Sequence, residues 1–285
     1  MDWSRDGARW PNREASRFVD AGGVRWHVQI AGSGPPLLLV HGTAAATHSW
    51  RDVLPLLSAR FTVVAPDLPG HGFTTPPPYA AGWSLPGMAA ALSRLLAALG
   101  VAPAAAAGHS AGAAILIAAA LDGGIVPRRI VALNGALLPF GGVGRHLFPT
   151  LAKIMFLNPL TPAVMAWRAG REGVVARLLE GTGSRIDRGG LALYERLLSD
   201  RGHVGAALSM MANWDLEALE RRLPALAVPL SLVVGRGDRA VPPAVAERAR
   251  ALVPQAEVIA MDGVGHLAHE ERPADVARVI AGLVS

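Results

Sequence analysis

Ser110 is the residue best placed to do chemistry, because it stands at the centre of Gly-His-Ser-Ala-Gly over residues 108–112. The G-x-S-x-G pattern is typical of a sharp turn from a strand into a helix, where small neighbours let the backbones approach and the serine hydroxyl is exposed. The turn also puts the hydroxyl at a helix N-terminus, whose partial positive charge favours a developing anion. The motif therefore predicts a nucleophilic serine.

A serine nucleophile needs a base that is held by an orienting acid, and the chain supplies both after Ser110. Asp238 follows the apolar run 230–234 through Gly-Arg-Gly, and His266 follows the last apolar run within Gly-Val-Gly-His at 263–266. Both are expected on loops after parallel strands, at the sheet edge where Ser110 lies. The predicted catalytic residues are Ser110, Asp238 and His266, with His266 as the base.

Other assignments stay open for the acid and the base. Asp238 also fits a plain turn residue, since Gly-Arg-Gly-Asp is turn-like in composition. Asp215 and Asp262 are the rival acids, and His269 is the rival base. The structural alternative for the serine is a mere helix cap, which the later aspartate and histidine disfavour.

The backbone amides of Thr43 and Ala111 are the predicted oxyanion donors. Acyl transfer needs N–H groups aimed at the oxygen that becomes negative, and the loss of one donor costs about 3 kcal/mol in the barrier. Ala111 directly follows the nucleophile, and Thr43 closes the His-Gly-Thr loop 41–43 after the apolar run 37–40.

Short apolar runs alternate with longer helical patterns, which predicts an α/β fold with a mostly parallel central sheet flanked by helices. The expected strands are 17–20, 24–30, 37–40, 61–65, 104–107, 129–133, 230–234 and 258–261. The expected helices are 47–59, 85–99, 111–121, 244–252 and 273–283. The alternation breaks near Pro139 and returns at 230, with helical patches between. We therefore expect one core, 1–140 and 225–285, with an inserted helical cap (lid) at 141–224.

The chain resembles the α/β-hydrolase family, in its cofactor-free branch that carries a cap. Besides 108–112, the resemblance rests on His-Gly at 41–42, Asp-Leu-Pro-Gly-His-Gly at 67–72, Gly-x-x-Asp-x-x-Val-Pro at 235–242 and Gly-His-x-x-His-Glu at 265–270. These motifs keep the family's order over nearly the whole chain. The resemblance implies the α/β-hydrolase fold and, with serine rather than aspartate at the elbow, hydrolysis of an ester, thioester, amide or C–C bond. It implies no cofactor and no metal.

A narrower resemblance lies in the N-terminal third. Trp-Pro-Asn-Arg-Glu-Ala-Ser-Arg-Phe at 10–18, Ala-Gly-Gly-Val-Arg-Trp-His at 21–27 and the segment 41–52 are similar to the BchO family of magnesium-chelatase accessory proteins in bacteriochlorophyll biosynthesis. That family implies a role near magnesium insertion into protoporphyrin, with chelatase subunits as partners, but it supplies no reaction. Two alternatives stay open: a non-catalytic accessory protein that binds a tetrapyrrole or the chelatase and keeps an inherited triad, and a general carboxylesterase.

A small apolar substrate, such as a tetrapyrrole or a related ester, needs an apolar pocket near Ser110. The residues predicted to line this pocket are His41, His109, Met155, Trp167, Met211 and Trp214. Arginines of the cap (Arg145, Arg168 or Arg171) are the expected partners of propionate carboxylates. The alternative for the apolar residues is packing within the cap's own core, and for the two histidines a local structural role.

Composition excludes several classes of protein. The 285 residues are 51% hydrophobic and 17% charged, so the chain can bury a core and is not disordered. The absence of cysteine excludes disulfide scaffolds, thiol nucleophiles and Cys-ligated zinc. The net charge of +5 comes from scattered arginines, with Lys153 the only lysine, which argues against nucleic acid. The longest apolar stretch, 111–121, is about half of a membrane span. We expect a cytoplasmic protein without a transmembrane segment, and peripheral contact with the photosynthetic membrane stays open.

Overall fold

Eight strands form one sheet in the computed structural model, whose described residues are 1–139, 158 and 160–284. The strands are β1 (Ser16–Ala21), β2 (Val24–Ala31), β3 (Pro36–Val40), β4 (Thr62–Pro66), β5 (Ala105–His109), β6 (Ile130–Leu133), β7 (Leu230–Gly235) and β8 (Glu257–Met261). Their order across the sheet is β1-β2-β4-β3-β5-β6-β7-β8. β2 pairs antiparallel with both β1 and β4, and all other neighbours are parallel. The predicted mostly parallel sheet is confirmed.

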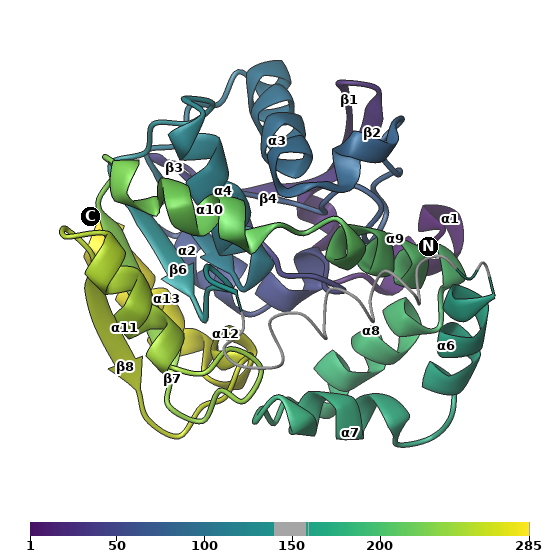
Figure 1. The fold of residues 1–285 in the computed structure, drawn as a ribbon. Helices are drawn as coiled ribbons and strands as arrows, with labels where there is room; N and C mark the ends of the chain where they lie inside the picture. Colours follow the sequence, from purple (N-terminus) through teal and green to yellow (C-terminus); the bar gives the residue numbers. More distant parts are fainter. Residues whose placement is uncertain (140–157, 159, 285) are drawn as a thin grey trace.

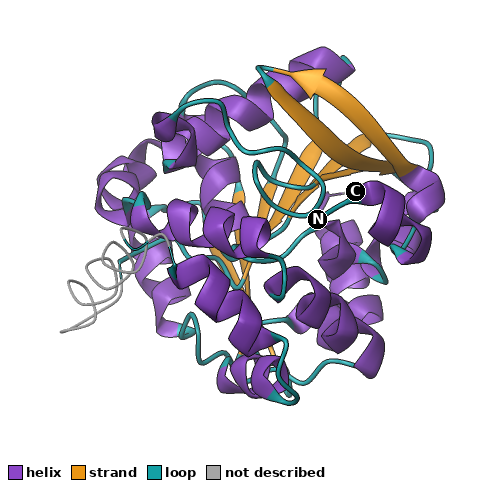
Figure 2. Cartoon of the chain, turned by 90° about the vertical axis from the view of Figure 1, so that its right-hand side faces the viewer, coloured by secondary structure: helices purple, strands orange, loops and turns teal. Residues whose placement is uncertain are grey.

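Helices cover both faces of this sheet (Figures 1 and 2). The helices of the core are α1 (Trp3–Asp6), α2 (Val53–Ser58), α3 (Leu85–Leu99), α4 (Ala111–Leu121), α11 (Ala244–Leu252), α12 (Ala268–Glu271) and α13 (Pro273–Val284). Short 3-10 turns lie at Gly7–Arg9, Arg13–Ala15, Thr47–Trp50, Ala80–Trp83 and Leu223–Ala225. The predicted helices over 85–99, 111–121 and 244–252 agree with the structure to the residue.

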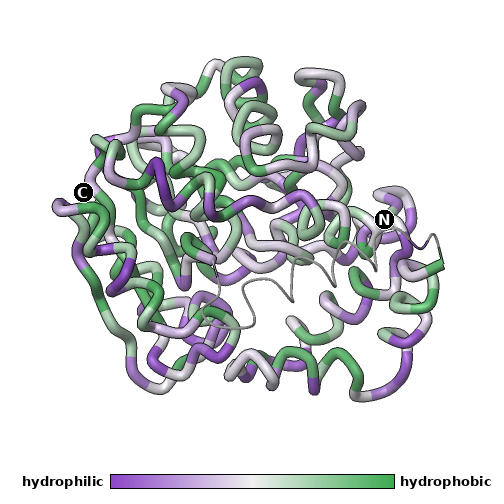
Figure 3. The backbone as a smooth tube through the Cα atoms, in the orientation of Figure 1, coloured by the Kyte–Doolittle hydropathy of each residue, from purple (hydrophilic) through white to green (hydrophobic). Residues whose placement is uncertain are grey.

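The alternation of side chains along each strand separates two hydrophobic cores. In β3, Leu38 and Val40 pack into the core beneath α3, α4 and α11, whereas Leu37 and Leu39 pack into the core beneath α2 and α13. Helix α4 is buried from residue 111 to 119, so it is apolar on every side rather than on one stripe. Figure 3 shows this hydrophobic centre as green strands around α4. The helix that follows Ser110 is therefore packed against the protein on every side.

One predicted helix is wrong in its extent. The pattern over 47–59 predicts a continuous helix, but the structure has a 3-10 turn at Thr47–Trp50 and a separate helix, α2, from Val53. Pro55 explains the break, because a proline ring collides with the carbonyl group four residues earlier and so prevents the helix from including Arg51.

The described residues between β6 and β7 form five helices, and we call the segment Thr161–Arg222 the helical insertion. They are α6 (Thr161–Ala169), α7 (Val174–Gly181), α8 (Arg188–Leu198), α9 (Arg201–Ala212) and α10 (Leu216–Arg222). Figure 1 shows α6 to α9 beside the core, with α9 close to α1. An ion pair between Arg196 on α8 and Asp6 on α1 (2.7 Å) joins the insertion to the N-terminal segment. The predicted cap boundary at 141, together with Arg145 and Met155, lies outside the described residues.

Candidate active site

Ser110 lies in a strained turn between β5 and α4. Its backbone has φ 50° and ψ −116°, a conformation that a non-glycine residue adopts at a cost and that clusters at functional sites. Gly108 and Gly112 make the turn possible. A Cβ atom on Gly108 would lie 2.5 Å from the nitrogen of Ala113, and one on Gly112 would lie 2.3 Å from the oxygen of Val40. The spacing of the sequence motif thus follows from backbone contacts with α4 and β3.

Asp238 and His266 are joined by a hydrogen bond, with 2.8 Å between Asp238 Oδ2 and His266 Nδ1. Asp238 follows β7 and His266 follows β8, so neighbouring parallel strands carry the two side chains to the same edge of the sheet. The other carboxylate oxygen, Oδ1, accepts from the backbone N–H groups of Ala240 and Val241, each at 2.8 Å. These bonds fix the orientation of the carboxylate towards His266.

Asn134 is a member of this site that the sequence did not single out. It directly follows β6 with φ 47°, and its amide Nδ2 donates to Asp238 Oδ2 over 2.7 Å. Asp238 Oδ2 therefore accepts from both Asn134 and His266. The sequence signal for Asn134 is its position at the carboxyl end of the strand beside β7, but an asparagine cannot ionise and is therefore excluded as the acid.

The ring of His109 links the serine turn to the loop of His266. His109 Nε2 donates to the backbone oxygen of His266 over 2.9 Å, and the two ring centroids are 4.7 Å apart. Among the described residues, the Ser110 hydroxyl forms no hydrogen bond, to His266 or to any other group. Contacts between a nucleophile and its base are often looser without substrate than in the reacting complex.

The loop after β3 lies against the serine. A Cβ atom on Gly42 would be 3.0 Å from Ser110 Cβ, which places residues 41–43 next to the nucleophile. His41 holds this loop from behind, because its Nδ1 donates to the oxygen of Gly42 (2.8 Å) and its Nε2 accepts from the N–H of Leu68 (2.9 Å). Burial lowers the pKa of His41, in agreement with a neutral ring. Within the described part of the chain, the N–H groups of Thr43 and Ala111 donate to no protein acceptor.

The predicted pocket residues have several different environments. His41 and His109 are buried, and both form hydrogen bonds within the protein. Trp167 on α6 is 62% exposed, with the guanidinium of Arg171 over its ring at 3.9 Å. Met211 on α9 is 47% exposed, and Trp214 is partly buried against the larger core. Their contact with a substrate stays a prediction.

The rival acids and the rival base are held elsewhere. Asp215 caps the N-terminus of α10, and Asp262 forms an exposed ion pair with Arg236 over 2.8 Å. His269 packs its ring between Trp50 and His109, with neither ring nitrogen hydrogen-bonded to a described residue. Burial lowers the pKa of His269 to about 3, so this ring is neutral at physiological pH. None of the three reaches the Asp238–His266 pair through a hydrogen bond.

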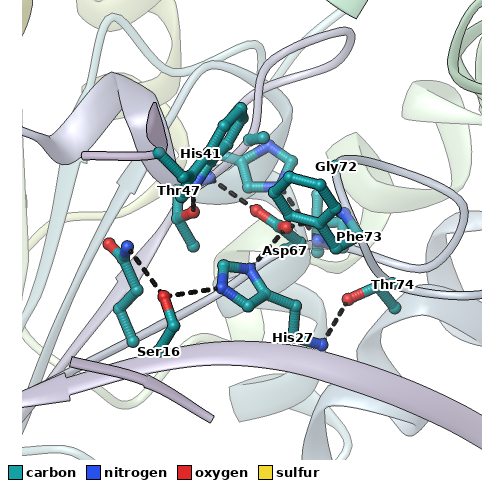
Figure 4. Close-up of polar contacts among 12 residues, drawn as sticks. Ser16, His27, His41, Thr47, Asp67, Gly72, Phe73 and Thr74 are labelled. Carbon is teal, nitrogen blue, oxygen red and sulfur yellow. Dashed lines mark hydrogen bonds and ion pairs between the residues drawn. The ribbon is translucent and has the colours of Figure 1, made fainter. Parts of the chain in front are cut away.

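A second Ser–His–Asp cluster lies at the β1–β2–β4 end of the sheet (Figure 4). Ser16 Oγ is 2.9 Å from His27 Nε2, and His27 Nδ1 is 2.7 Å from Asp67 Oδ2. Asp67 also accepts from the backbone N–H groups of Thr47 (2.6 Å) and Phe73 (2.9 Å), and its pKa is strongly lowered by His27 and these bonds despite complete burial. This cluster therefore repeats the residue types of the candidate site in a different setting.

Two further properties bear on function. Among the described residues, no group of three or more histidine, aspartate or glutamate side chains is arranged to hold a metal ion. No helix in the same part of the chain is long and apolar enough to cross a bilayer.

The strained serine turn, the following helix and the His–Asp pair at the carboxyl edge of the sheet are arranged as in a hydrolase of the α/β class. A model of the alpha/beta hydrolase family matches residues 37–279, and the chain belongs to this family. Solved structures agree on the fold. They include an epoxide hydrolase, CorEH (TM-score 0.80, 23% identity, 94% of this chain and 97% of that one), and CarC, a serine hydrolase involved in carbazole degradation (TM-score 0.74, 21% identity, 94% and 98%).

One relative is more similar in sequence to this chain than the solved structures are. The chain is 42% identical to the magnesium-chelatase 30 kDa subunit of Rhodobacter capsulatus over 266 residues, which cover 92% of each chain. This relative confirms the resemblance to magnesium-chelatase accessory proteins that was predicted from the N-terminal third.

Proposed function

We propose that this protein is a serine hydrolase in which Ser110 is the nucleophile, His266 the general base and Asp238 the acid that orients it. The observation that carries the proposal is the strained backbone of Ser110 at the N-terminus of α4, beside an Asp238–His266 pair held at 2.8 Å. A strained residue persists only where the surrounding structure over-determines it, and such strain clusters at functional sites.

The reaction follows from these positions. Ser110 Oγ attacks a carbonyl carbon while His266 Nε2 takes the hydroxyl proton, and Asp238 stabilises the resulting imidazolium. The backbone N–H groups of Thr43 and Ala111 hold the oxygen that becomes negative. His266 then gives its proton to the leaving group, which departs and leaves an acyl-serine. A water molecule, deprotonated by His266, releases the acid and restores Ser110.

We propose a tetrapyrrole or a related ester as the substrate, at the magnesium-chelation stage of bacteriochlorophyll biosynthesis. The support is the 42% identity to a protein named as a magnesium-chelatase subunit. Residues 141–224 would form a cap over a core of 1–140 and 225–285, and the exposed Trp167 with Arg171 over its ring offers an aromatic face and a cation to a planar, acidic pigment. Protoporphyrin and its magnesium form are the compounds to titrate. Quenching of tryptophan fluorescence is expected, and unchanged protein fluorescence and pigment absorbance would contradict the substrate class.

Labelling by a fluorophosphonate probe tests the reaction itself. The wild-type protein should be labelled, and Ser110→Ala should abolish the labelling. Ser209→Ala is the matched control, because the Ser209 hydroxyl donates within its own helix α9, to the oxygen of Gly205 (2.7 Å). Folded wild-type protein that remains unlabelled would argue strongly against an active triad.

The name of the relative favours a second candidate, a non-catalytic accessory protein that binds a magnesium-chelatase subunit. The two candidates make opposite predictions in a phototrophic host. If the protein is a hydrolase, Ser110→Ala fails to restore pigment synthesis to a deletion strain, and the intermediate that accumulates identifies the step. If Ser110→Ala restores synthesis as fully as the wild type does, the accessory role is the correct one.

A further inference from the structure

Three contacts from the helical insertion reach residues directly beside the proposed catalytic groups. The backbone oxygen of Thr182 accepts from the N–H of Arg239, next to Asp238, over 3.0 Å. The hydroxyl of Ser184 accepts from the N–H of Leu267, next to His266, over 2.9 Å. On α9, His203 Nε2 donates to the oxygen of Ala44, next to Thr43, over 3.0 Å. One inserted segment therefore contacts the neighbours of the acid, the base and the oxyanion donor.

The turn between α7 and α8 packs backbone against backbone on the acid and base loops. Gly183 has φ +86°, and a Cβ atom there would lie 2.0 Å from the oxygen of Gly237. A Cβ atom on Gly265 would lie 2.3 Å from the carbonyl group of Gly183. Ser184, 1% exposed, sits in this contact and is also 3.1 Å from the hydroxyl of Thr182. The loops that carry Asp238 and His266 thus have no room to shift towards the insertion.

His203 joins the insertion to two loops of the core, the oxyanion loop through Nε2 and the loop after β4 through Nδ1. Nε2 donates to the oxygen of Ala44, and Nδ1 accepts from the N–H of Gly72 over 3.1 Å. Burial lowers the pKa of His203 to about 4, which agrees with this neutral tautomer. Ala44 has φ 61°, a conformation that alanine holds only under constraint, and the Thr43 hydroxyl meets the sulfur of Met210, also on α9, at 3.8 Å. The shape of the oxyanion loop thus depends on α9.

We propose that the helical insertion completes the catalytic machinery, with His203 positioning the oxyanion loop and Ser184 positioning the loop of His266. The proposal rests on the serine-hydrolase function above and goes beyond it. If the insertion were a lid that only covers the substrate, substitutions in it would change substrate binding and therefore KM. An insertion that holds the loops of the oxyanion donor and the base changes the rate of the chemical step, so any ligand or partner that moves the insertion alters kcat.

A pair of substitutions at His203 separates the two hydrogen bonds. In His203→Gln, the amide nitrogen can take the place of Nε2 and keep the bond to Ala44, while the bond from Gly72 is lost. In His203→Asn, the amide oxygen can take the place of Nδ1 and keep the bond from Gly72, while the bond to Ala44 is lost. Each variant loses one neutral hydrogen bond, so their urea midpoints should be similar.

The readouts are hydrolysis of p-nitrophenyl butyrate and inhibition by phenylboronic acid, whose tetrahedral adduct places an oxygen in the oxyanion hole. His203→Asn should lower kcat by roughly 10- to 100-fold with little change in KM, and should weaken boronate inhibition by a similar factor, because small misplacements of catalytic groups cost this much. His203→Gln should stay close to the wild type. Equal kcat values in the two variants would overturn the positioning role of His203.

Ser184→Ala tests the second contact, with Ser209→Ala as the matched control that removes one serine hydroxyl from the same insertion. Ser184→Ala should lower kcat by about tenfold at unchanged KM, and Ser209→Ala should not. If both variants match the wild type, Ser184 has no positioning role.

These outcomes separate this proposal from the one on which it rests. If the wild-type protein neither hydrolyses the ester nor reacts with a fluorophosphonate, the hydrolase function fails and the positioning roles fail with it. If the wild type reacts and the insertion variants react equally well, only the inference about the insertion is overturned.

Discussion

The region around Ser110 and the region around Ser16 contain the same three residue types, and in both a histidine is hydrogen-bonded to an aspartate. Around Ser16 both bonds are formed, at 2.9 Å from serine to His27 and 2.7 Å from His27 to Asp67. Around Ser110 the described residues form the His–Asp bond alone, at 2.8 Å. By hydrogen bonds alone, the cluster that we consider structural is the more complete of the two.

The two serines differ in their surroundings. Ser16 opens β1 and pairs with Gln29 in a regular antiparallel ladder, and Gln29 Nε2 also approaches its hydroxyl at 3.3 Å. Ser110 instead occupies a strained turn at the N-terminus of a buried helix, beside a loop in which the N–H of Thr43 donates to no acceptor among the described residues. A serine becomes a catalyst through its exposure and its oxyanion donors as well as through its base.

Asp238 accepts from backbone N–H groups of its own loop, at Ala240 and Val241, whereas Asp67 also bonds to a segment distant in the chain. Its carboxylate holds the backbone of Thr47, after the oxyanion loop, and that of Phe73, in the loop after β4 (Figure 4). Trp3 and Phe73 pack around the ring of His27. The cluster joins the N-terminal segment, β2 and two loops, so we infer that its role is stability.

The largest expected effect comes from Asp238→Asn. The amide cannot stabilise the imidazolium of His266 and favours the wrong tautomer, so kcat on p-nitrophenyl butyrate should fall by on the order of 10⁴-fold. Asp262→Asn is the control, since the carboxylate of Asp262 forms an exposed ion pair with Arg236. Comparable kcat values in the two variants would show that Asp238 is not the acid that orients His266.

Asp67→Asn should act on stability instead. It removes the charge from a buried group with three strong partners, and the free energy of unfolding, measured with urea, should fall by about 3 to 5 kcal/mol. A loss of unfolding free energy below about 1 kcal/mol would contradict the structural role of the Ser16 cluster.

The stability of the protein should depend on pH through buried histidines near Asp67. The ring of His71 lies against those of His41 and His203. Burial lowers the pKa of His203 from 6.5 to about 4. As pH falls from 6.5 to 4, the unfolded chain binds a proton that folded His203 does not, so stability falls by about 1.4 kcal/mol per pH unit from this residue. Urea unfolding at pH 7 and pH 5.5 should show a smaller loss in His203→Gln than in the wild type. Equal losses would contradict the assignment.

Ser16→Ala should have the smallest effect. It leaves His27 Nε2 without its partner at a half-buried position, which costs about 1 kcal/mol of stability. Ester hydrolysis at 25 °C should be unchanged. A large loss of activity with little loss of stability would give the second cluster a catalytic role.

Much of the core could be predicted from the sequence, because its signals are local. The apolar runs of the parallel strands and the glycines at 108 and 112 reflect contacts within one strand–turn–helix unit. Asp238 and His266 could be placed near each other because both follow parallel strands, whose carboxyl ends share an edge. Their chemical roles remain predictions.

Other members of the site depend on contacts that no local pattern encodes. Asn134 meets Asp238 across two strands, and Ser184 and His203 reach the core from the insertion. Trp167 is exposed, and α6 packs instead at Ala166 against α9, which the residue types alone do not indicate. Only the assembled chain shows such partners.

Mapping the fluorophosphonate adduct by peptide mass spectrometry tests the central claim most directly, because it asks which of the two serines reacts. We expect a single adduct on the peptide that contains Ser110, lost in Ser110→Ala and retained in Ser16→Ala. An adduct on Ser16, or labelling that survives in Ser110→Ala, would contradict the account.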